Sequence, residues 1–398
     1  MSHESPTSMM RPPRREAPQP LSSPRRRGPI LAAAALVALA LGWVWLWYYS
    51  ASVTDSTLAG WARREAAAGR TYSCASRAIG GFPFRIEARC TDAAAEINND
   101  EVHLDVKAKD LVFAAQLYRP TVLIGTITAP LTLAQSGQAP SLVANWLDAK
   151  LSVGGLPADP KDASLVLERP RVDRAANGRE GEVIFVADHA DLQGRMIEGS
   201  ANNRPVIETV LHLAAAQAPA LHPLLAQPIE AEFDAVLRGF RDLSPKPWAE
   251  RFREMQAAGG SIEIRVLRLV RPDAIVVGNG RLSVNAHGKL DGTISVAVAG
   301  IETIVPLLGI DQMIGRGLSR LSGSDSASTE GLGALDRLVP GLGGAIRETA
   351  NATVIDNLKK MGQPTEIDKK PAVVLPLRFV DGAISLGMLP LGQAPQLF

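Results

Sequence analysis

The residues best suited to chemistry are few and lie far apart along the 398-residue chain. Of the six histidines, His189 lies between two carboxylates, Asp188 and Asp191, in the segment ADHAD. An imidazole with flanking carboxylates is a set of ligands that a divalent metal could use. Charged residues at the end of a strand more often face solvent, however. The sequence therefore favours a solvated strand end here over a metal site.

Motifs of the common catalytic and cofactor sites are missing from the sequence. It contains no His-x-x-x-His pair, no Gly-x-Ser-x-Gly segment and no phosphate loop that ends in Gly-Lys-Ser or Gly-Lys-Thr. The glycine pairs Gly331-x-Gly333 and Gly341-x-Gly343 lack the strand-to-helix context of a dinucleotide site. We therefore expect a protein that is not an enzyme, with no catalytic residues, no cofactor and no metal.

The two cysteines, Cys74 and Cys90, are the only thiols of the chain. No histidine lies between them, so a zinc site is not indicated. If this part of the chain lies in an oxidising compartment, the two thiols are expected to pair. A disulfide that closes a loop of this size stabilises the fold by roughly 3 kcal/mol. Two separate buried thiols are the alternative.

A hydrophobic segment near the N-terminus has the length of a membrane span. Residues 30–49, ILAAAALVALALGWVWLWYY, carry no charge, and a helix of that length spans roughly 30 Å. The arginines of residues 1–29 precede the segment, so the positive-inside rule predicts a cytoplasmic N-terminus and a periplasmic position for the rest. The aromatic residues expected at the outer membrane–water interface are Trp43, Trp45, Trp47, Tyr48 and Tyr49.

The location that these features predict is the bacterial inner membrane, with a single-pass anchor at residues 30–49. Residues 1–29 are rich in Pro, Ser and Arg without apolar periodicity, which indicates a disordered cytoplasmic tail. A cleaved signal peptide is the main alternative, with Ala38-Leu39-Ala40 as its cleavage site. The apolar stretch continues well past that site, which favours the uncleaved anchor. Paired arginines also hint at a twin-arginine signal, but the pattern that normally follows them is missing.

The overall charge argues against nucleic acid as a partner. Forty-two basic residues against 41 acidic residues give a formal net charge of +1. Both signs are interspersed after residue 50, as on an ordinary solvated surface. The hydrophobic content of 46% is enough for a sizeable core.

The segment GGFPFRIEARC, residues 80–90, predicts a turn that leads into a strand. Gly80 and Gly81 allow backbone angles that other residues avoid, and Pro83 restricts its own. Apolar residues then alternate with Arg85, Glu87 and Arg89, which is typical of a strand with one buried face.

Alternating apolar and polar residues dominate the chain from there to its end and predict an antiparallel meander. Two tight hairpins are expected, at Asp291-Gly292 and at Asp381-Gly382. The fold class that results is α+β and β-dominated: a long, curved antiparallel sheet with a few covering helices, after one transmembrane helix. Candidate residues for an apolar face of this sheet are Leu282, Val284, Ile294, Val296 and Val298.

Three helices are expected besides the membrane span. One begins at Asp55 or Ser56 and ends at Gly69, a second covers residues 244–258, and a third covers residues 301–321. We expect a periplasmic β-rich domain at residues 50–320 and a Ser-rich flexible linker at 321–330. Residues 331–398 are expected to form a helical segment and a C-terminal β-hairpin that complete the same domain.

Several segments together resemble a known bacterial family. These are the anchor, the following GFPFRIE, then GNGRLSVNAHGKLDGTISVAVAG and the closing LPLRFVDGAISLGMLPLG. Over most of residues 30–398 the chain resembles the uncharacterised proteobacterial family called domain of unknown function 2125. A weaker similarity, in strand-Gly-strand repeats, reaches the AsmA-like envelope proteins, in which long curved sheets form grooves for acyl chains. The resemblance implies an envelope location and transfers no functional residue.

Two functions from different classes fit these features. We favour a non-catalytic, inner-membrane-anchored periplasmic protein that binds or transfers a lipid or other hydrophobic envelope component along an apolar sheet face. The predicted helices could instead cover that face and leave an ordinary core. The alternative function is a structural or assembly factor of the cell envelope that acts through contacts with envelope proteins.

Overall fold

The computed structural model describes residues 27–98, 103–156, 160–176, 179–197, 204–243, 246–307, 342–386 and 389–398. The chain divides into two units, Met1–Tyr49 and Ser50–Phe398, and each is described by itself. The predicted linker at 321–330, most of the predicted tail, the predicted helix beyond Leu307 and the start of the predicted 331–398 segment lie outside the described residues.

The hydrophobic N-terminal segment lies in one long helix, α1 (Arg27–Ala67), which contains a stretch long and apolar enough to span a membrane. The prediction of a separate helix from Asp55 or Ser56 is wrong, because α1 continues without a break. No Gly or Pro lies between Gly42 and Gly60, and the hydroxyl groups bond to the preceding helical turn instead of capping a new helix. Thr54 Oγ1 donates to the carbonyl of Ser50 (2.8 Å) and Ser56 Oγ to that of Val53 (2.9 Å).

The aromatic residues predicted for the membrane interface lie within this helix. Trp45, Tyr48 and Tyr49 are exposed, and Trp45 stacks on Tyr49 with 5.6 Å between ring centroids. Trp47 meets Tyr48 edge-on at 5.2 Å. Their role at a membrane interface stays a prediction.

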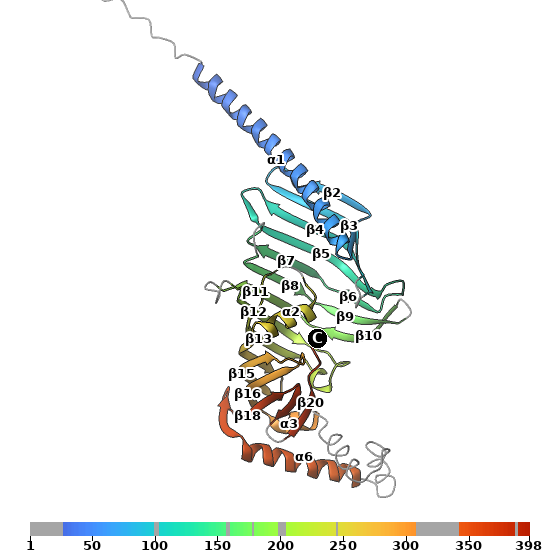
Figure 1. The fold of residues 1–398 in the computed structure, drawn as a ribbon, viewed down its shortest axis with the longest axis vertical. Helices are drawn as coiled ribbons and strands as arrows, with labels where there is room; N and C mark the ends of the chain where they lie inside the picture. The colour runs from blue at the N-terminus through green and yellow to red at the C-terminus, as the bar shows by residue number, and fades with distance from the viewer. Residues whose placement is uncertain are drawn as a thin grey trace, which may run out of the picture. The chain divides into compact units, whose positions relative to one another are not determined.

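The described residues of the second unit form one sheet of 20 strands, which confirms the predicted antiparallel, β-dominated fold (Figure 1). Apolar and polar residues alternate along these segments, and short turns join them, as expected for antiparallel strands. The strands are β1 (Arg70–Ser73), β2 (Ser76–Gly80), β3 (Arg85–Asn98), β4 (His103–Gln116), β5 (Arg119–Gln135), β6 (Leu142–Asn145), β7 (Asp148–Gly154), β8 (Asp162–Glu168), β9 (Arg171–Ala176), β10 (Arg179–Val186), β11 (His189–Met196), β12 (Ile207–Ala216), β13 (Ile229–Arg238), β14 (Ser261–Val270), β15 (Ile275–Val284), β16 (Leu290–Ala299), β17 (Gln363–Ile367), β18 (Lys370–Val380), β19 (Ala383–Leu386) and β20 (Leu389–Gln393).

Most strands pair with their neighbours in sequence, as in a meander. The order branches at β5, whose first part pairs with β7 and whose last part pairs with β6. β7 continues through β8 to β11, whereas β6 continues through β9 to β10. From β11 the sheet runs through β12, β13, β14, β15 and β16 to β18.

The described residues after α1 contain the helices η2 (Pro223–Leu225), α2 (Trp248–Ala257), α3 (Ile301–Leu307) and α6 (Leu342–Met361). Figure 1 shows α3 and α6 at the C-terminal strands of the sheet. α6 contacts β17, β18 and α3, while α2 contacts β15. The main hydrophobic core lies beneath α3 and α6, where Val305, Leu358 and Leu375 are almost fully buried.

The GGFPF segment forms the turn between β2 and β3. Gly81 has a positive φ of 96°, which favours glycine, and its carbonyl accepts the N–H of Arg85 (3.2 Å). Gly80 ends β2, and Pro83 follows a cis peptide bond. Cys74 and Cys90, on either side of this hairpin, form a disulfide with 5.4 Å between their Cα atoms.

The tight turn at Asp381-Gly382 joins β18 to β19, and both residues have positive φ (47° and 76°), as a two-residue hairpin of type I′ requires. The hairpin predicted at Asp291-Gly292 is wrong. Both residues lie inside β16, opposite Ser283 and Leu282 of β15. Glycine is nevertheless needed there, because a Cβ at Gly292 would lie 2.2 Å from the carbonyl oxygen of Arg281.

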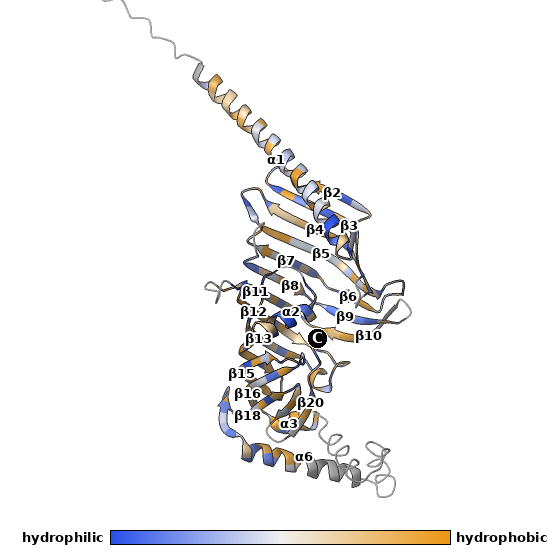
Figure 2. Ribbon diagram, viewed as in Figure 1, coloured by the Kyte–Doolittle hydropathy of each residue, from blue (hydrophilic) through white to orange (hydrophobic). Residues whose placement is uncertain are grey.

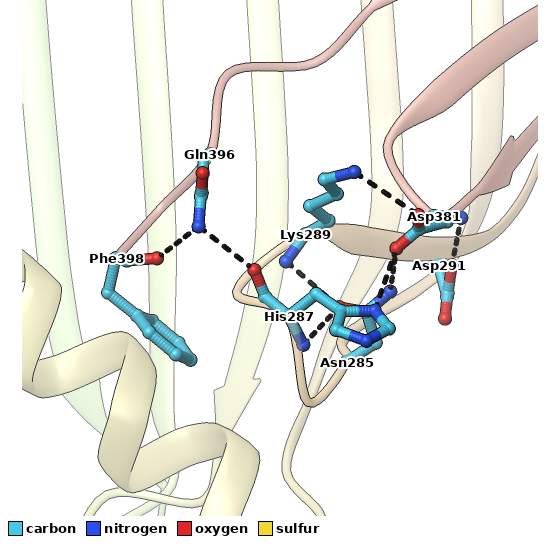
Figure 3. Close-up of polar contacts among 7 residues, drawn as sticks. All are labelled: Asn285, His287, Lys289, Asp291, Asp381, Gln396 and Phe398. Atoms are coloured by element: carbon cyan, nitrogen blue, oxygen red, sulfur yellow. Dashed lines mark hydrogen bonds and ion pairs between the residues drawn. The ribbon is translucent and has the colours of Figure 1, made fainter.

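The true turn between β15 and β16 covers residues 285–289 (Figure 3). Asn285 holds it, because its Oδ1 accepts the N–H groups of His287 and Lys289, each at 3.0 Å. Asp381 of the neighbouring hairpin accepts from Lys289 Nζ (3.1 Å) and Asn285 Nδ2 (3.0 Å). The hydrogen bonds from Lys289, Asn285 and His287 lower the pKa of Asp381. Local side-chain bonds therefore outweigh the Asp-Gly preference in setting this turn.

Candidate functional site

A continuous apolar strip crosses the sheet on one of its faces. Directly paired residues of antiparallel strands point to the same face, so the register identifies which side chains lie side by side. One row contains, strand after strand, only apolar residues and glycine: Ala88, Phe113, Gly125, Leu151, Leu165, Leu192, Leu211, Phe233, Leu267, Gly278, Val296 and Leu375.

Two further rows flank the first on the same face, two residues away along each strand except at the bulge of β14, where Ile264 and Leu267 are three residues apart. The second row is Ala115, Leu123, Val153, Ala163, Gly194, Thr209, Ala235, Ile264, Gly280, Ile294, Leu377 and Leu386. The third row is Ala149, Leu167, Ala190, Leu213, Ala231, Leu269, Val276, Val298 and Val373. Thr209 is the only polar member of the three rows, which together form the apolar strip.

The exposure of the strip changes along the sheet. At its C-terminal end Val296 is 7% exposed and Leu375 is 0% exposed, beneath Val305 of α3 and Leu358 of α6. Towards the N-terminal strands the side chains of the same row are only half-buried, and Leu192 is 42% exposed. A Cβ built at Gly194 would meet no atom within 4 Å, so the space above this part of β11 is empty.

The strip therefore has a covered part and an open part. α2 makes its main strand contacts with β15 and α6 with β17 and β18, while α3 contacts α6 and η2. Phe233 of β13 already packs against the core cluster with α3 and α6, and Leu213 of β12 packs in a cluster with Leu225 of η2. We call the stretch from β4 to β12 the open apolar face. Its large side chains are half-buried or exposed, in contrast with the covered part, and apolar residues recur on these strands in Figure 2. The members are Phe113, Leu123, Leu151, Val153, Leu165, Leu167, Leu192 and Leu211.

The size of the open apolar face follows from sheet geometry. Six strands, β4, β5, β7, β8, β11 and β12, at a spacing of about 4.8 Å make it roughly 24 Å long. Two rows cross all six strands and the third joins them at β7, so rows spaced at about 6.7 Å make the face at most roughly 13 Å wide. The resulting area, on the order of 300 Å², is within the range of the largest patches on monomeric proteins, which are often functional.

The opposite face of the same strands is polar. A row next to the apolar strip, but pointing to the other side, consists of Thr126, Lys150, Val166, Asp191, His212, Glu232 and Arg268. A pocket of about 490 Å³ on this face is lined by Asp162, Asp191, Arg195 and Glu208 among others. Charged walls make this pocket unsuitable for an apolar chain.

Ion pairs tie the strands together on the polar face. Glu208 of β12, 8% exposed, accepts from Arg195 of β11 and, at 2.5 Å, from Arg265 of β14. The hydrogen bond from Arg195 is the main cause of a lowered pKa of Glu208. Since the folded protein lowers this pKa, the ion pair stabilises the fold at pH values above the unfolded pKa of about 4.3.

We expect Glu208→Gln to reduce the free energy of unfolding at pH 7 by about 1–3 kcal/mol, because two arginines lose a charged acceptor. The loss should shrink as the pH falls through the folded pKa of Glu208, below about 4.3, where the wild-type carboxylate is protonated too. Urea unfolding at pH 7 and pH 3.5 measures both effects. Glu366→Gln, at an exposed position, is the control. An equal loss at both pH values would contradict this account.

The sequence placed the candidate apolar face in the covered part of the strip. Leu282, Val284, Ile294, Val296 and Val298 are all buried, four of them in the core cluster with α3 and α6 and Val284 in a cluster with α2. The open residues of β4 to β12 were not singled out from the sequence. Their alternation was visible, but which alternating strands carry helices above them depends on contacts between distant segments.

The remaining candidate residues lie apart. His189 Nδ1 is 3.0 Å from Glu168 Oε1 on β8, while Asp191 Oδ2 accepts from Gln193 (2.8 Å). Within the residues that the structure describes, no group of three or more His, Cys, Asp or Glu side chains is arranged to hold a metal ion. The turn residues and the disulfide lie at sheet ends, away from the middle of the open apolar face.

Comparison with known proteins matches the chain to one family. The model of a family described as "Uncharacterized protein conserved in bacteria (DUF2125)" matches residues 47–395, which is most of the chain. The chain belongs to the DUF2125 family. The match begins within the aromatic end of the apolar segment and includes every strand of the sheet. No curated protein matches the chain. Similarity of this DUF2125 protein to AsmA-like envelope proteins stays a prediction.

Proposed function

We propose that this protein binds a lipid or other hydrophobic envelope component along the open apolar face and passes it along the sheet. The observation that supports the proposal is the register: neighbouring rows of apolar residues cross the strands, while the adjacent row on the other face is mostly polar or charged. Binding, and not catalysis, is the activity that such a surface can supply.

The energetics of the open apolar face suit an acyl chain. Backbone polar groups in the middle of the sheet are satisfied by neighbouring strands, so the strip offers an apolar surface to a ligand. About 300 Å² of apolar contact at roughly 25 cal/mol per Å² corresponds to about 7 kcal/mol before the costs of association. Contacts of this kind are non-directional, so a chain can slide between equivalent positions along the rows.

The compartment that fits this function is the periplasmic side of the inner membrane. The apolar segment within α1 supports an anchor, and the arginines before it support a cytoplasmic N-terminus. The disulfide between Cys74 and Cys90 supports an oxidising environment for the sheet.

Site-specific photo-crosslinking of the full chain in cells tests the proposal. The photoreactive amino acid p-benzoylphenylalanine is placed at Leu192 on the open apolar face. Its matched control is Gln193, the next residue of β11, whose side chain points to the polar face. After irradiation, purification and mass spectrometry, we expect a lipid adduct at position 192 and none at position 193.

Two outcomes would contradict lipid binding. An absence of lipid adduct at both positions, with the chain correctly inserted and disulfide-bonded, would remove its main support. A protein adduct at position 192 in place of lipid would favour the alternative function, a structural or assembly factor of the envelope.

A further inference from the structure

Exposed aromatic side chains gather at two adjacent turns where the sheet begins. Phe82 (53% exposed) and Phe84 (63%) lie in the β2–β3 turn, and Tyr118 (68%) lies in the β4–β5 turn. The turns touch, because the N–H of Leu117 donates to the carbonyl of Phe84 (3.0 Å). We call these two turns, residues 81–84 and 117–118, the aromatic tip.

Basic residues follow both turns directly. Arg85 begins β3 and Arg119 begins β5, and both side chains are exposed. Arg85 Nη2 contacts Glu87 at 3.0 Å, and the same carboxylate also contacts Arg89. Arg85, Arg89 and Arg119 therefore lie near the aromatic tip. This combination of aromatic and basic side chains matches the interface of an anionic bilayer.

The contacts of residues 50–67 of α1 with β1 and β2 show towards which end of the sheet this part of the helix points. Glu65 pairs with Arg70 at 2.5 Å, Trp61 packs on Tyr72 with 4.7 Å between centroids, and Asp55 pairs with Arg77 at 2.8 Å. Helix residues closer to the N-terminus therefore contact residues further along β1 and β2, so the helix runs antiparallel to these two strands. The helix end at Ser50 therefore points towards the β2–β3 turn, which follows Arg77 by four residues.

The aromatic tip thus lies at the end of the sheet towards which the Ser50 end of the helix points. Ser50 directly follows Tyr49, the last residue of the apolar segment. Under the proposed function, on which this inference rests, residues 30–49 lie in a bilayer to which the sheet is tethered. Tethering raises the effective concentration of the bilayer surface, so weak insertion of a few aromatic rings is enough for stable contact.

We propose that the aromatic tip docks into the outer interface of the bilayer that holds residues 30–49. Phe82, Phe84 and Tyr118 enter the interface, and Arg85 and Arg119 contact anionic headgroups. Docking brings the first strands of the open apolar face to the membrane surface, because Ala115, which begins the second row, lies two residues before Leu117 of the β4–β5 turn and pairs with Ile86, two residues after Phe84. The anchoring bilayer is then the lipid donor.

A fluorescence measurement on the full chain in vesicles tests this docking. Tyr118→Cys is labelled with the environment-sensitive dye NBD under non-reducing conditions, which keep the Cys74–Cys90 disulfide. Vesicles contain phosphatidylethanolamine and phosphatidylglycerol, with or without doxyl-labelled phosphatidylcholine as a quencher. The matched control is Val380→Cys, an equally exposed apolar residue (66%) beside another tight turn. Flotation of the vesicles shows that the chain is anchored.

We expect the label at position 118 to emit at shorter wavelength than at position 380 and to be quenched by doxyl lipid at least about twofold more strongly. A label at Phe82→Cys should behave like that at position 118. An emission wavelength as in water at positions 118 and 82 would overturn the docking. A blue shift without quenching by doxyl lipid would also overturn it, because the label would then be in contact with protein. A chain that does not float would overturn the anchor and the docking together.

The outcome of this experiment is independent of the crosslinking test of the proposed function. A lipid adduct at Leu192 combined with an unquenched tip would retain lipid binding and remove the docking. A quenched tip without an adduct at Leu192 would retain the docking as a membrane contact of a protein with another function.

Discussion

Leu192→Glu is expected to reduce lipid contact on the open apolar face by more than about tenfold, because a carboxylate among acyl chains costs several kcal/mol. Leu192 is in the middle of the central row, between Leu165 and Leu211, and is exposed enough to accept the longer polar side chain without unfolding the sheet. The yield of lipid adduct from p-benzoylphenylalanine at Leu211, the directly paired position on β12, measures the effect.

The control for this substitution is Gln193→Glu. It makes the same residue at the next position of the same strand, but on the polar face, where solvent screens the added charge. The adduct yield at Leu211 should then stay within about twofold of the wild-type yield. Equal losses from both substitutions would mean that the charge acts through the stability of β11 and not through the ligand.

Val296→Asp is expected to abolish the cooperative unfolding transition of the sheet's C-terminal part. Val296 is 7% exposed, opposite Gly278 and Leu375, beneath α3 and α6. Burial of an unpaired carboxylate there costs several kcal/mol, which is comparable with the total stability of a domain, about 5–15 kcal/mol. Thermal unfolding followed by near-ultraviolet circular dichroism measures the loss of packing.

Ser295→Asp, one residue earlier on the exposed side of β16, is the matched substitution. Its midpoint temperature should change by no more than a few degrees, since an exposed substitution costs within about 0.5 kcal/mol. If Val296→Asp unfolds at the wild-type temperature, α3 and α6 do not cover this part of the strip, and the division between the covered part and the open apolar face is wrong.

Local pattern was enough to predict several features of this chain. Alternation with period two predicted the antiparallel sheet, because it places apolar side chains on one face wherever a strand forms. An uncharged segment of 20 residues predicted a helix of membrane-spanning length. The two-residue turn at Asp381-Gly382 was also predictable, since few residue pairs accept two positive φ angles.

Other features depend on contacts that local pattern does not encode. The predicted hairpin at Asp291-Gly292 competes with the hydrogen bonds of Asn285, which set the turn six residues earlier. The predicted helix start at Asp55 or Ser56 fails because its hydroxyls bond back into α1. In both cases a residue type that suits a turn or cap has another bonding partner, and only the folded chain shows which partner it takes.

The apolar strip illustrates the same difference at the level of function. The sequence by itself determined that one side of the sheet is apolar from strand to strand, because the alternation is present in each strand. Tertiary structure decided where the strip is covered, since α3 and α6 are joined to β16 and β17 in sequence and pack on the strands closest to them. Val296 and Leu192 have the same place in the row, and only the helices above one of them make it core and leave the other open to a ligand.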